Sequence, residues 1–236
     1  LFEMGPAGGQ GFIKLGDTNR VFDVGADAQF NINWTITSNT PASGSLTKNG
    51  SGTLTLNANN PYSGGTTINA GTLVLGHATD TLANAGAVTV NGGTLSLGTN
   101  NDTIGALTLT GGSITGTTGV LTASSLTLQN GTVSAILAGS ASINKTTSGT
   151  LTLSGAGNNY TGTTTVNAGT LQLSGNISSS ALTLNSGALI SVGTNTTIAK
   201  YNTSSITIGA GGEHERRVFI DVDIFMQCQR TREHLQ

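Results

Sequence analysis

Charged residues are scarce in this sequence. Asp, Glu, Lys and Arg make up 8% of its 236 residues, against about 25% in an average globular protein. The formal net charge is −2, so no long-range field attracts nucleic acid or an anionic membrane. The single cysteine, Cys228, excludes an internal disulfide framework. No apolar run is long enough for a transmembrane helix. We therefore expect no nucleic-acid partner and no membrane insertion by this segment.

Proline, at 3 residues, is also scarce, whereas glycine, at 35, is abundant. Together with many Ser, Thr and Asn residues, this composition could indicate a disordered low-complexity polymer. Disorder usually goes with high net charge and few β-branched residues. This chain has little net charge, is rich in Thr, Val and Ile, and spaces its apolar residues regularly. These features favour a folded protein.

A short frame recurs six times along the chain. In each copy an apolar residue is followed three places on by glycine and five places on by a second apolar residue. The spacings between successive copies are 22, 19, 19, 38 and 18 residues, and we interpret the 38 as two periods of 19. The first apolar positions are Ile68, Val90, Leu109, Leu128, Val166 and Leu184.

Each copy is interpreted as a strand, a tight turn and a second strand. Alternation predicts Leu54 and Leu56 on the inward face and Thr53 and Thr55 on the outward face. Glycine supplies positive φ in such turns, and Asn can hydrogen-bond its own local backbone. The predicted turn residues are Asn69, Gly71, Asn91, Gly93, Gly112, Gly131, Asn167, Gly169, Asn185 and Gly187.

A unit of about 20 residues cannot bury its apolar face alone, so the units must pack on one another. Antiparallel hairpins in a sandwich or barrel are one solution. The near-constant period favours the other, in which like residues stack on like residues. We therefore predict an all-β fold, a right-handed single-stranded parallel β-helix (β-solenoid) with coils of about 20 residues. Residues 1–45 are assigned to N-terminal lead-in or capping strands, and residues 46–212 to the β-helix repeats.

Two units are longer than the others, at residues 46–76 and 143–174. The first contains Lys48, "GSGTLTL", Tyr62-Ser63-Gly64-Gly65-Thr66-Thr67 and "NAGTL". The second contains Lys145, "SGTLTL", Tyr160-Thr161-Gly162-Thr163-Thr164-Thr165 and "NAGTL". This pattern closely resembles the autotransporter-associated β-strand repeat, also called the passenger-associated transport repeat, and the resemblance extends over roughly residues 20–212. The family consists of secreted or surface-displayed β-helical rods.

The resemblance implies a non-enzymatic structural or adhesive passenger segment of a bacterial autotransporter-like protein, located outside the cell or on its surface. It also implies that stacking of coils assists export. We expect the signal peptide and the translocator β-barrel to lie outside this chain. The alternative is a glycan- or matrix-binding adhesin module that uses loops 76–87 and 98–105. Expected partners are accordingly host or matrix glycans and proteins, or other cell-surface chains.

Composition changes abruptly after Gly212. Residues 46–212 contain five charged residues, whereas residues 213–236 contain nine. We interpret residues 213–236 as an atypical charged tail, either an artefact of the gene end, such as a shifted reading frame, or a cap. Charges on a cap would blunt the exposed edge of the last coil. Asp221 and Asp223 lack the further oxygen ligands of a calcium loop.

Catalytic residues are not evident in the repeats. A polysaccharide-degrading β-helix needs paired carboxylates, or a carboxylate-held metal with a base, and residues 46–212 contain only Asp80 and Asp102. We interpret both as solvated turn residues, and place His77 in a turn as well. Asp17, Asp23 and Asp27 are expected on the surface of the lead-in. The sequence thus predicts no enzyme, no catalytic residue, no cofactor and no metal site.

The remaining candidates concern surface binding. Tyr62 and Tyr160 occupy the same repeat position and are expected to pack over a turn rather than to stack on sugars. Trp34 is expected to pack in the core or lead-in. Outward threonines could order water and bind ice, but their spacing varies and Gln129 and Gln172 interrupt the pattern. These threonines are Thr53, Thr55, Thr72, Thr94, Thr108, Thr127, Thr150, Thr152, Thr170 and Thr183.

Overall fold

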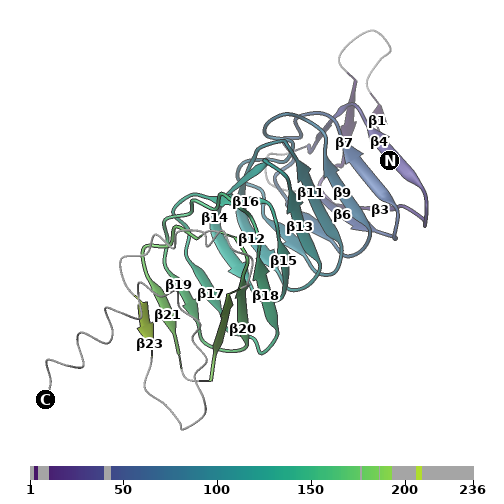
Figure 1. The fold of residues 1–236 in the computed structure, drawn as a ribbon. Helices are drawn as coiled ribbons and strands as arrows, with labels where there is room; N and C mark the ends of the chain where they lie inside the picture. The colour runs from purple at the N-terminus through teal and green to yellow at the C-terminus, as the bar shows by residue number, and fades with distance from the viewer. Residues whose placement is uncertain are drawn as a thin grey trace, which may run out of the picture.

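The fold is a stack of parallel β-coils, seen as a rod in a computed structural model (Figure 1). The structure describes residues 3–4, 11–39, 44–175, 177–185, 187–192 and 206–208. No helix occurs in these ranges, and hence none that is long and apolar enough to cross a membrane. The charged tail 213–236, with Asp221, Asp223 and Cys228, lies outside the described residues.

Two large sheets run along the rod, and we call them the first and second sheets. The first has 11 strands and the second has 9. The first contains β3 (Asn19–Asp23), β6 (Ser45–Asn49), β8 (Thr66–Ile68), β10 (Val88–Val90), β12 (Asp102–Leu109), β14 (Val120–Leu128), β16 (Ile136–Ala138), β17 (Ile143–Lys145), β19 (Thr164–Val166), β21 (Leu182–Leu184) and β23 (Ile206–Ile208). The second contains β4 (Gln29–Ile32), β7 (Thr53–Leu56), β9 (Thr72–Leu75), β11 (Thr94–Gly98), β13 (Ser113–Gly116), β15 (Gly131–Val133), β18 (Thr150–Leu153), β20 (Thr170–Leu173) and β22 (Leu189–Val192).

A third, small sheet lies at the N-terminal end. It contains β1 (Glu3–Met4), β2 (Phe12–Lys14) and β5 (Thr35–Thr37), and β1 pairs antiparallel with β2. In the lead-in, β3 and β4 pair in parallel with β6 and β7. The lead-in therefore contributes strands to the same two sheets as the repeats.

Successive coils place each strand beside its equivalent one turn later, and parallel pairing joins them in both large sheets. The chain forms a β-solenoid of about nine turns with coils of about 20 residues, which confirms the predicted fold class. The pairing explains the sequence frame, because inward residues at one register position form a column along the rod. Ile68, Val90, Leu109 and Leu128 form such a column and are buried.

The gap of 38 residues in the frame contains a coil that the periodicity did not place correctly. Leu126 pairs with Ile143, which puts Lys145 in the column after Leu128. The column then continues from Lys145 to Val166 and Leu184. The gap therefore divides into steps of 17 and 21 residues, and the residue in the inward position is a lysine.

The corner glycines meet two different demands. Five of the six predicted corner glycines have positive φ, between 64° and 112°: Gly71, Gly112, Gly131, Gly169 and Gly187. Gly93 is not among the residues with positive φ. A Cβ atom at Gly93 would lie 2.7 Å from Ile68 Cγ2 and 2.8 Å from Gly71 O. At that corner glycine is needed because the neighbouring coil lies so close.

Candidate functional site

The most distinctive buried groups of the solenoid lie in the two long repeats. Lys48 and Lys145 are both 0% exposed and point into the core. Lys48 Nζ donates hydrogen bonds to Asn49 O at 2.7 Å, Gly50 O at 2.7 Å and Ala70 O at 3.2 Å. An ammonium has three N–H donors, so these three carbonyls match its donors and join two successive corners.

Lys145 has the same position but a different set of acceptors. Its Nζ donates to Gln129 O at 2.9 Å, Thr147 O at 2.8 Å and Thr147 Oγ1 at 3.4 Å. Burial lowers the pKa of both lysines, and the charge of Asp23 partly offsets this effect on the pKa of Lys48. In both repeats the lysine thus holds corner carbonyls from within the core.

Each long repeat also buries an asparagine that links neighbouring coils. Asn60 Oδ1 accepts a hydrogen bond from Ile36 N at 2.8 Å, and its Nδ2 donates to Thr81 O at 2.8 Å. Asn158 Oδ1 accepts from Leu137 N at 2.8 Å, and its Nδ2 donates to Gly155 O at 3.0 Å. Both side chains bind the backbone of the preceding coil in the same way.

A tyrosine and a threonine complete the buried set. Tyr62 Oη lies 2.7 Å from Thr66 Oγ1, and Tyr160 Oη lies 2.9 Å from Thr164 Oγ1. The two rings are 1% and 0% exposed. They are therefore internal rather than packed over a turn as expected, and no sugar can stack on them. We call Lys48, Asn60, Tyr62 and Thr66, and their equivalents Lys145, Asn158, Tyr160 and Thr164, the buried polar sets.

Asp102 is buried, contrary to the prediction of a solvated turn residue. It begins β12, pairs in register with Leu121 of β14, and is 2% exposed. Its Oδ2 accepts a hydrogen bond from Leu82 N at 3.1 Å, whereas its Oδ1 is buried without a partner. Burial raises the pKa of Asp102 to about 7, although the hydrogen bond from Leu82 N opposes this rise.

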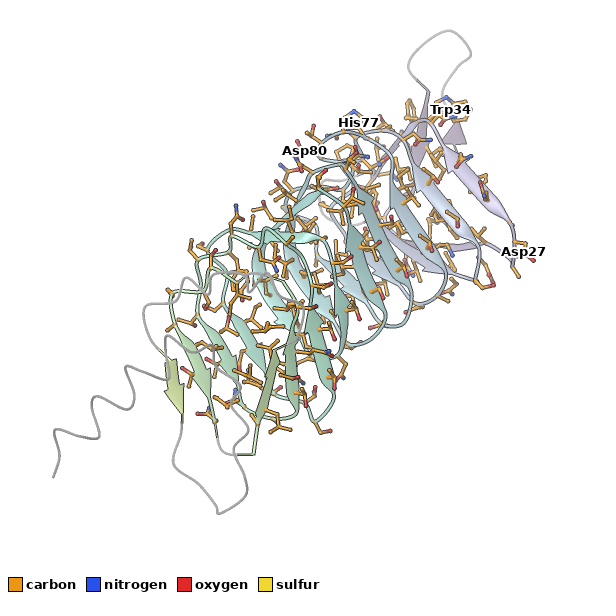
Figure 2. The ribbon with its side chains drawn as sticks, in the orientation of Figure 1. Asp27, Trp34, His77 and Asp80 are labelled. Carbon is orange, nitrogen blue, oxygen red and sulfur yellow. The ribbon has the colours of Figure 1, made fainter. Side chains whose placement is uncertain are left out.

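The loop over Asp102 contains Asp80 and His77, which Figure 2 shows on the outside of the rod. Asp80 has a positive φ of 51°, and its charge contributes to the raised pKa of Asp102. The His77 ring contacts Thr79 O through Nδ1 within the same loop. The second expected loop, 98–105, is wrong in extent, because Asp102–Leu109 is strand β12. No group of three metal-ligating side chains occurs in the described part of the chain.

The outward corner asparagines form hydrogen-bonded ladders. Asn69 Nδ2 donates to Asn49 Oδ1 at 2.9 Å, Asn91 Nδ2 donates to Asn69 Oδ1 at 2.9 Å, and Thr110 Oγ1 donates to Asn91 Oδ1 at 3.0 Å. A second ladder joins Asn144, Asn167 and Asn185. Gln129 separates the two ladders, because its Oε1 accepts from Thr146 N at 2.8 Å and from Thr147 N at 3.2 Å.

Outward hydroxyls form two columns with continuous register. The column on the first sheet comprises Thr47, Thr67, Thr89, Thr108 and Thr127. The column on the second sheet comprises Thr53, Thr72, Thr94, Ser113, Thr132 and Thr152, and ends at Gln172. Gln129 does not interrupt either column, because its side chain is 8% exposed and bound to the backbone. The variable sequence spacing is absorbed between the strands.

The exposed large apolar side chains lie at the first and last coils. Val21, Phe30 and Trp34 are 55%, 48% and 46% exposed, and Leu189 is 51% exposed. Trp34 is thus half exposed rather than in the core, but its ring covers Gly11, where a Cβ atom would lie 3.1 Å from the ring. Figure 2 shows Trp34 and Asp27 at the N-terminal end of the rod. Asp27 is exposed, with a positive φ of 59°.

The family model of the passenger-associated transport repeat matches residues 46–75 and 143–173. These matches coincide with the two coils that contain the buried polar sets. The chain carries two passenger-associated transport repeats. We call them the first and second passenger repeats. Such repeats belong to autotransporter passenger domains, which are exported to the cell surface. No curated protein and no solved structure matches the chain.

Sequence reasoning identified both passenger repeats but missed the roles of four of their residues. Asn60, Asn158, Thr66 and Thr164 were not singled out as functional positions. A signal existed, because the spacing from Asn to Tyr to Thr is the same in "NPYSGGT" (60–66) and "NNYTGTT" (158–164). Each of these side chains satisfies backbone or hydroxyl groups inside the solenoid, so the sets stabilise coils and present no reactive group to solvent.

Proposed function

We propose that the described chain is a non-enzymatic stalk segment of a secreted or surface-attached autotransporter passenger. The observation that carries this proposal is the coincidence of the passenger-repeat matches with coils whose conspicuous side chains are internal. A stalk requires regular stacking rather than a reaction centre, and the in-register columns support that requirement. Each added coil extends the rod by about 4.8 Å.

A register-preserving deletion tests the stalk function. Leu107 pairs with Leu126, so removal of residues 107–125 joins two equivalent positions and removes one coil. In a passenger displayed on a bacterial surface, a stalk tolerates this deletion, with protease resistance retained and the purified rod shorter by about 5 Å in small-angle scattering. The control is removal of residues 107–116, which shifts the register and should abolish protease resistance. Equal loss of surface display in both deletions would contradict the stalk function.

The adhesive part of the proposal concerns the loop 76–87, which presents His77 and Asp80 on the outside of the rod (Figure 2). A glycan array probed with the full chain tests it. Binding that is lost when residues 77–80 are replaced by Gly-Ser supports adhesion through this loop. Absence of binding to every glycan leaves the chain with the stalk function and removes glycan adhesion from the proposal.

A second candidate function follows from the hydroxyl columns, and it is binding to ordered water at an ice surface. Its support is the unbroken register of six outward hydroxyls on the second sheet. Thermal hysteresis of the full chain, lost in Thr94→Lys and kept in Thr108→Lys on the other sheet, would support it. Hysteresis equal to that of a control protein at the same concentration would reject it.

A further inference from the structure

Asp102 lies in an inward column that is otherwise aliphatic. Leu121 follows it in register on β14, and Leu137 follows Leu121 on β16. Both leucines are 0% exposed. The carboxyl group therefore occupies a position that the next two coils fill with leucine, and its surroundings cannot solvate a charge.

The loop 76–87 closes over this carboxyl group. It connects β9 to β10 and is attached to the next coil by the bridge between Thr79 and Asn101. Leu82, in this loop, is 2% exposed and donates its N–H to Asp102 Oδ2. Among the described side chains, Asp102 Oδ1 and Ser63 Oγ are the buried polar atoms without a hydrogen-bond partner.

Two ionisable groups act on Asp102 from the surrounding elements. Asp80 belongs to the loop itself, and its charge disfavours ionisation of Asp102. Tyr62 comes from the preceding coil, is fully buried and also interacts electrostatically with Asp102. The following strands β14 and β16 contribute Leu121 and Leu137 at this register position. No cation among these groups compensates an ionised carboxylate.

We propose that Asp102 is a proton-dependent latch that keeps the loop 76–87 closed when it is protonated and favours local opening when it ionises. In the closed loop an ionised Asp102 would hold an unpaired oxygen among leucines. In the open loop water can hydrate that oxygen. Ionisation therefore favours the open state, and the adhesive face of the rod changes with pH.

The direction of this linkage follows from the raised pKa of Asp102, about 7 in the closed state. In the open state we expect the ordinary value of about 3.9. Below about pH 4 both states are protonated, so the loop has its full closed-state stability. Between about pH 4 and 7 the opening constant rises by up to about tenfold per pH unit, and above pH 7 it levels off.

Amide hydrogen exchange tests the latch on the full chain. The loop 76–87 is followed by mass spectrometry between pH 4.5 and 8.5, with rates corrected for intrinsic exchange. The wild-type protection factor should fall by up to about tenfold per pH unit to about pH 7 and then remain constant. Residues 150–173 of the second passenger repeat should keep constant protection, which separates local opening from global unfolding.

Three variants define the origin of the effect. Asp102→Asn retains an acceptor for Leu82 N–H but cannot ionise, and its loop protection should be independent of pH. Asp80→Asn removes a neighbouring charge and should move the levelling-off to lower pH, which tests the latch even if Asp102→Asn does not fold. Asp27→Asn changes an exposed aspartate of the lead-in and should behave as wild type.

Three results would overturn the proposal. The first is loop protection that does not change with pH in the wild type. The second is a pH dependence that persists unchanged in Asp102→Asn. The third is a parallel loss of protection in residues 150–173, which would show that the whole solenoid rather than the loop responds to pH.

Discussion

The passenger repeats and the coils between them bury polar side chains under opposite conditions. In the passenger repeats, Lys48 and Lys145 are surrounded by hydrogen-bond acceptors that neighbouring corners supply. In the intervening coils, Asp102 has one bonded oxygen and one buried oxygen without a partner. Because an unsatisfied buried group is costly, the passenger repeats use their polar groups for stability, whereas Asp102 lowers stability when it is ionised.

The largest expected effect is on the lysine of the first passenger repeat. Lys48→Met keeps an apolar stem of similar length but leaves three carbonyls without their donor. Hydrogen bonds to charged groups contribute about 1.5–3 kcal/mol each and are not additive, so we expect a loss of about 3 kcal/mol in unfolding free energy. Urea unfolding followed by circular dichroism measures it. Ile68→Met, at the next position of the same column, is the control and should cost under about 1.5 kcal/mol.

Lys145→Met sharpens this prediction. Its acceptors include Thr147 Oγ1, and Thr147 is only partly buried. Water can therefore replace part of the lost bonding, and the loss should be smaller than for Lys48→Met. An equal loss in the two variants would show that the shared column position, rather than the acceptor set, determines the contribution of the lysine.

Asp102→Asn tests the opposite side of the comparison. The pKa of Asp102 is raised to about 7 in the folded state, and a rise of about three pKa units corresponds to about 4 kcal/mol. This stability is present at pH 4 and is lost as pH rises to 7, so wild type should weaken relative to Asp102→Asn by up to about 4 kcal/mol. Urea unfolding of both proteins at pH 4.5, 6 and 8 measures the difference, because other titrations cancel. A difference that is constant with pH would contradict the assignment.

Both buried charges could be placed from the sequence only by alternation. Leu46 is inward, so Lys48, two residues later, is inward as well, and the same holds for Ile143 and Lys145. Ile104 likewise predicts an inward Asp102. Charged side chains are normally assigned to the surface, and that preference outweighed the alternation. The acceptors come from other coils, so sequence reasoning could not show that these positions tolerate a charge.

The coil architecture was predictable because its determinants are local and repeated. Alternating residues such as Thr53 and Leu54 set the two faces, and the Asn-Gly corners set the period. Loop extents were less accessible. The start of β12 at Asp102 depends on pairing with β14 in the next coil, which a local pattern does not contain.

The tyrosines provide a smaller test, in which the two passenger repeats should agree. Tyr62→Phe and Tyr160→Phe each remove a buried hydroxyl and leave Thr66 or Thr164 without its partner. We expect each to lose about 1–2 kcal/mol in unfolding free energy. Adding Thr66→Val or Thr164→Val should then cost little further, which a double-mutant cycle measures. Additive losses would show that the hydroxyl pairs are not coupled.

The smallest effect should come from the outward ladder, which continues from the first passenger repeat into the coils between the repeats. Asn91→Ala removes the hydrogen bonds to Asn69 and from Thr110. All three side chains are exposed, so water replaces the lost partners and the loss should stay below about 1 kcal/mol. Thr89→Ala, on the outward face of the same coil, is the control for removal of a surface side chain. A loss for Asn91→Ala as large as that for Lys48→Met would place the stabilising polar groups on the surface of the rod and remove the contrast between the passenger repeats and the coils between them.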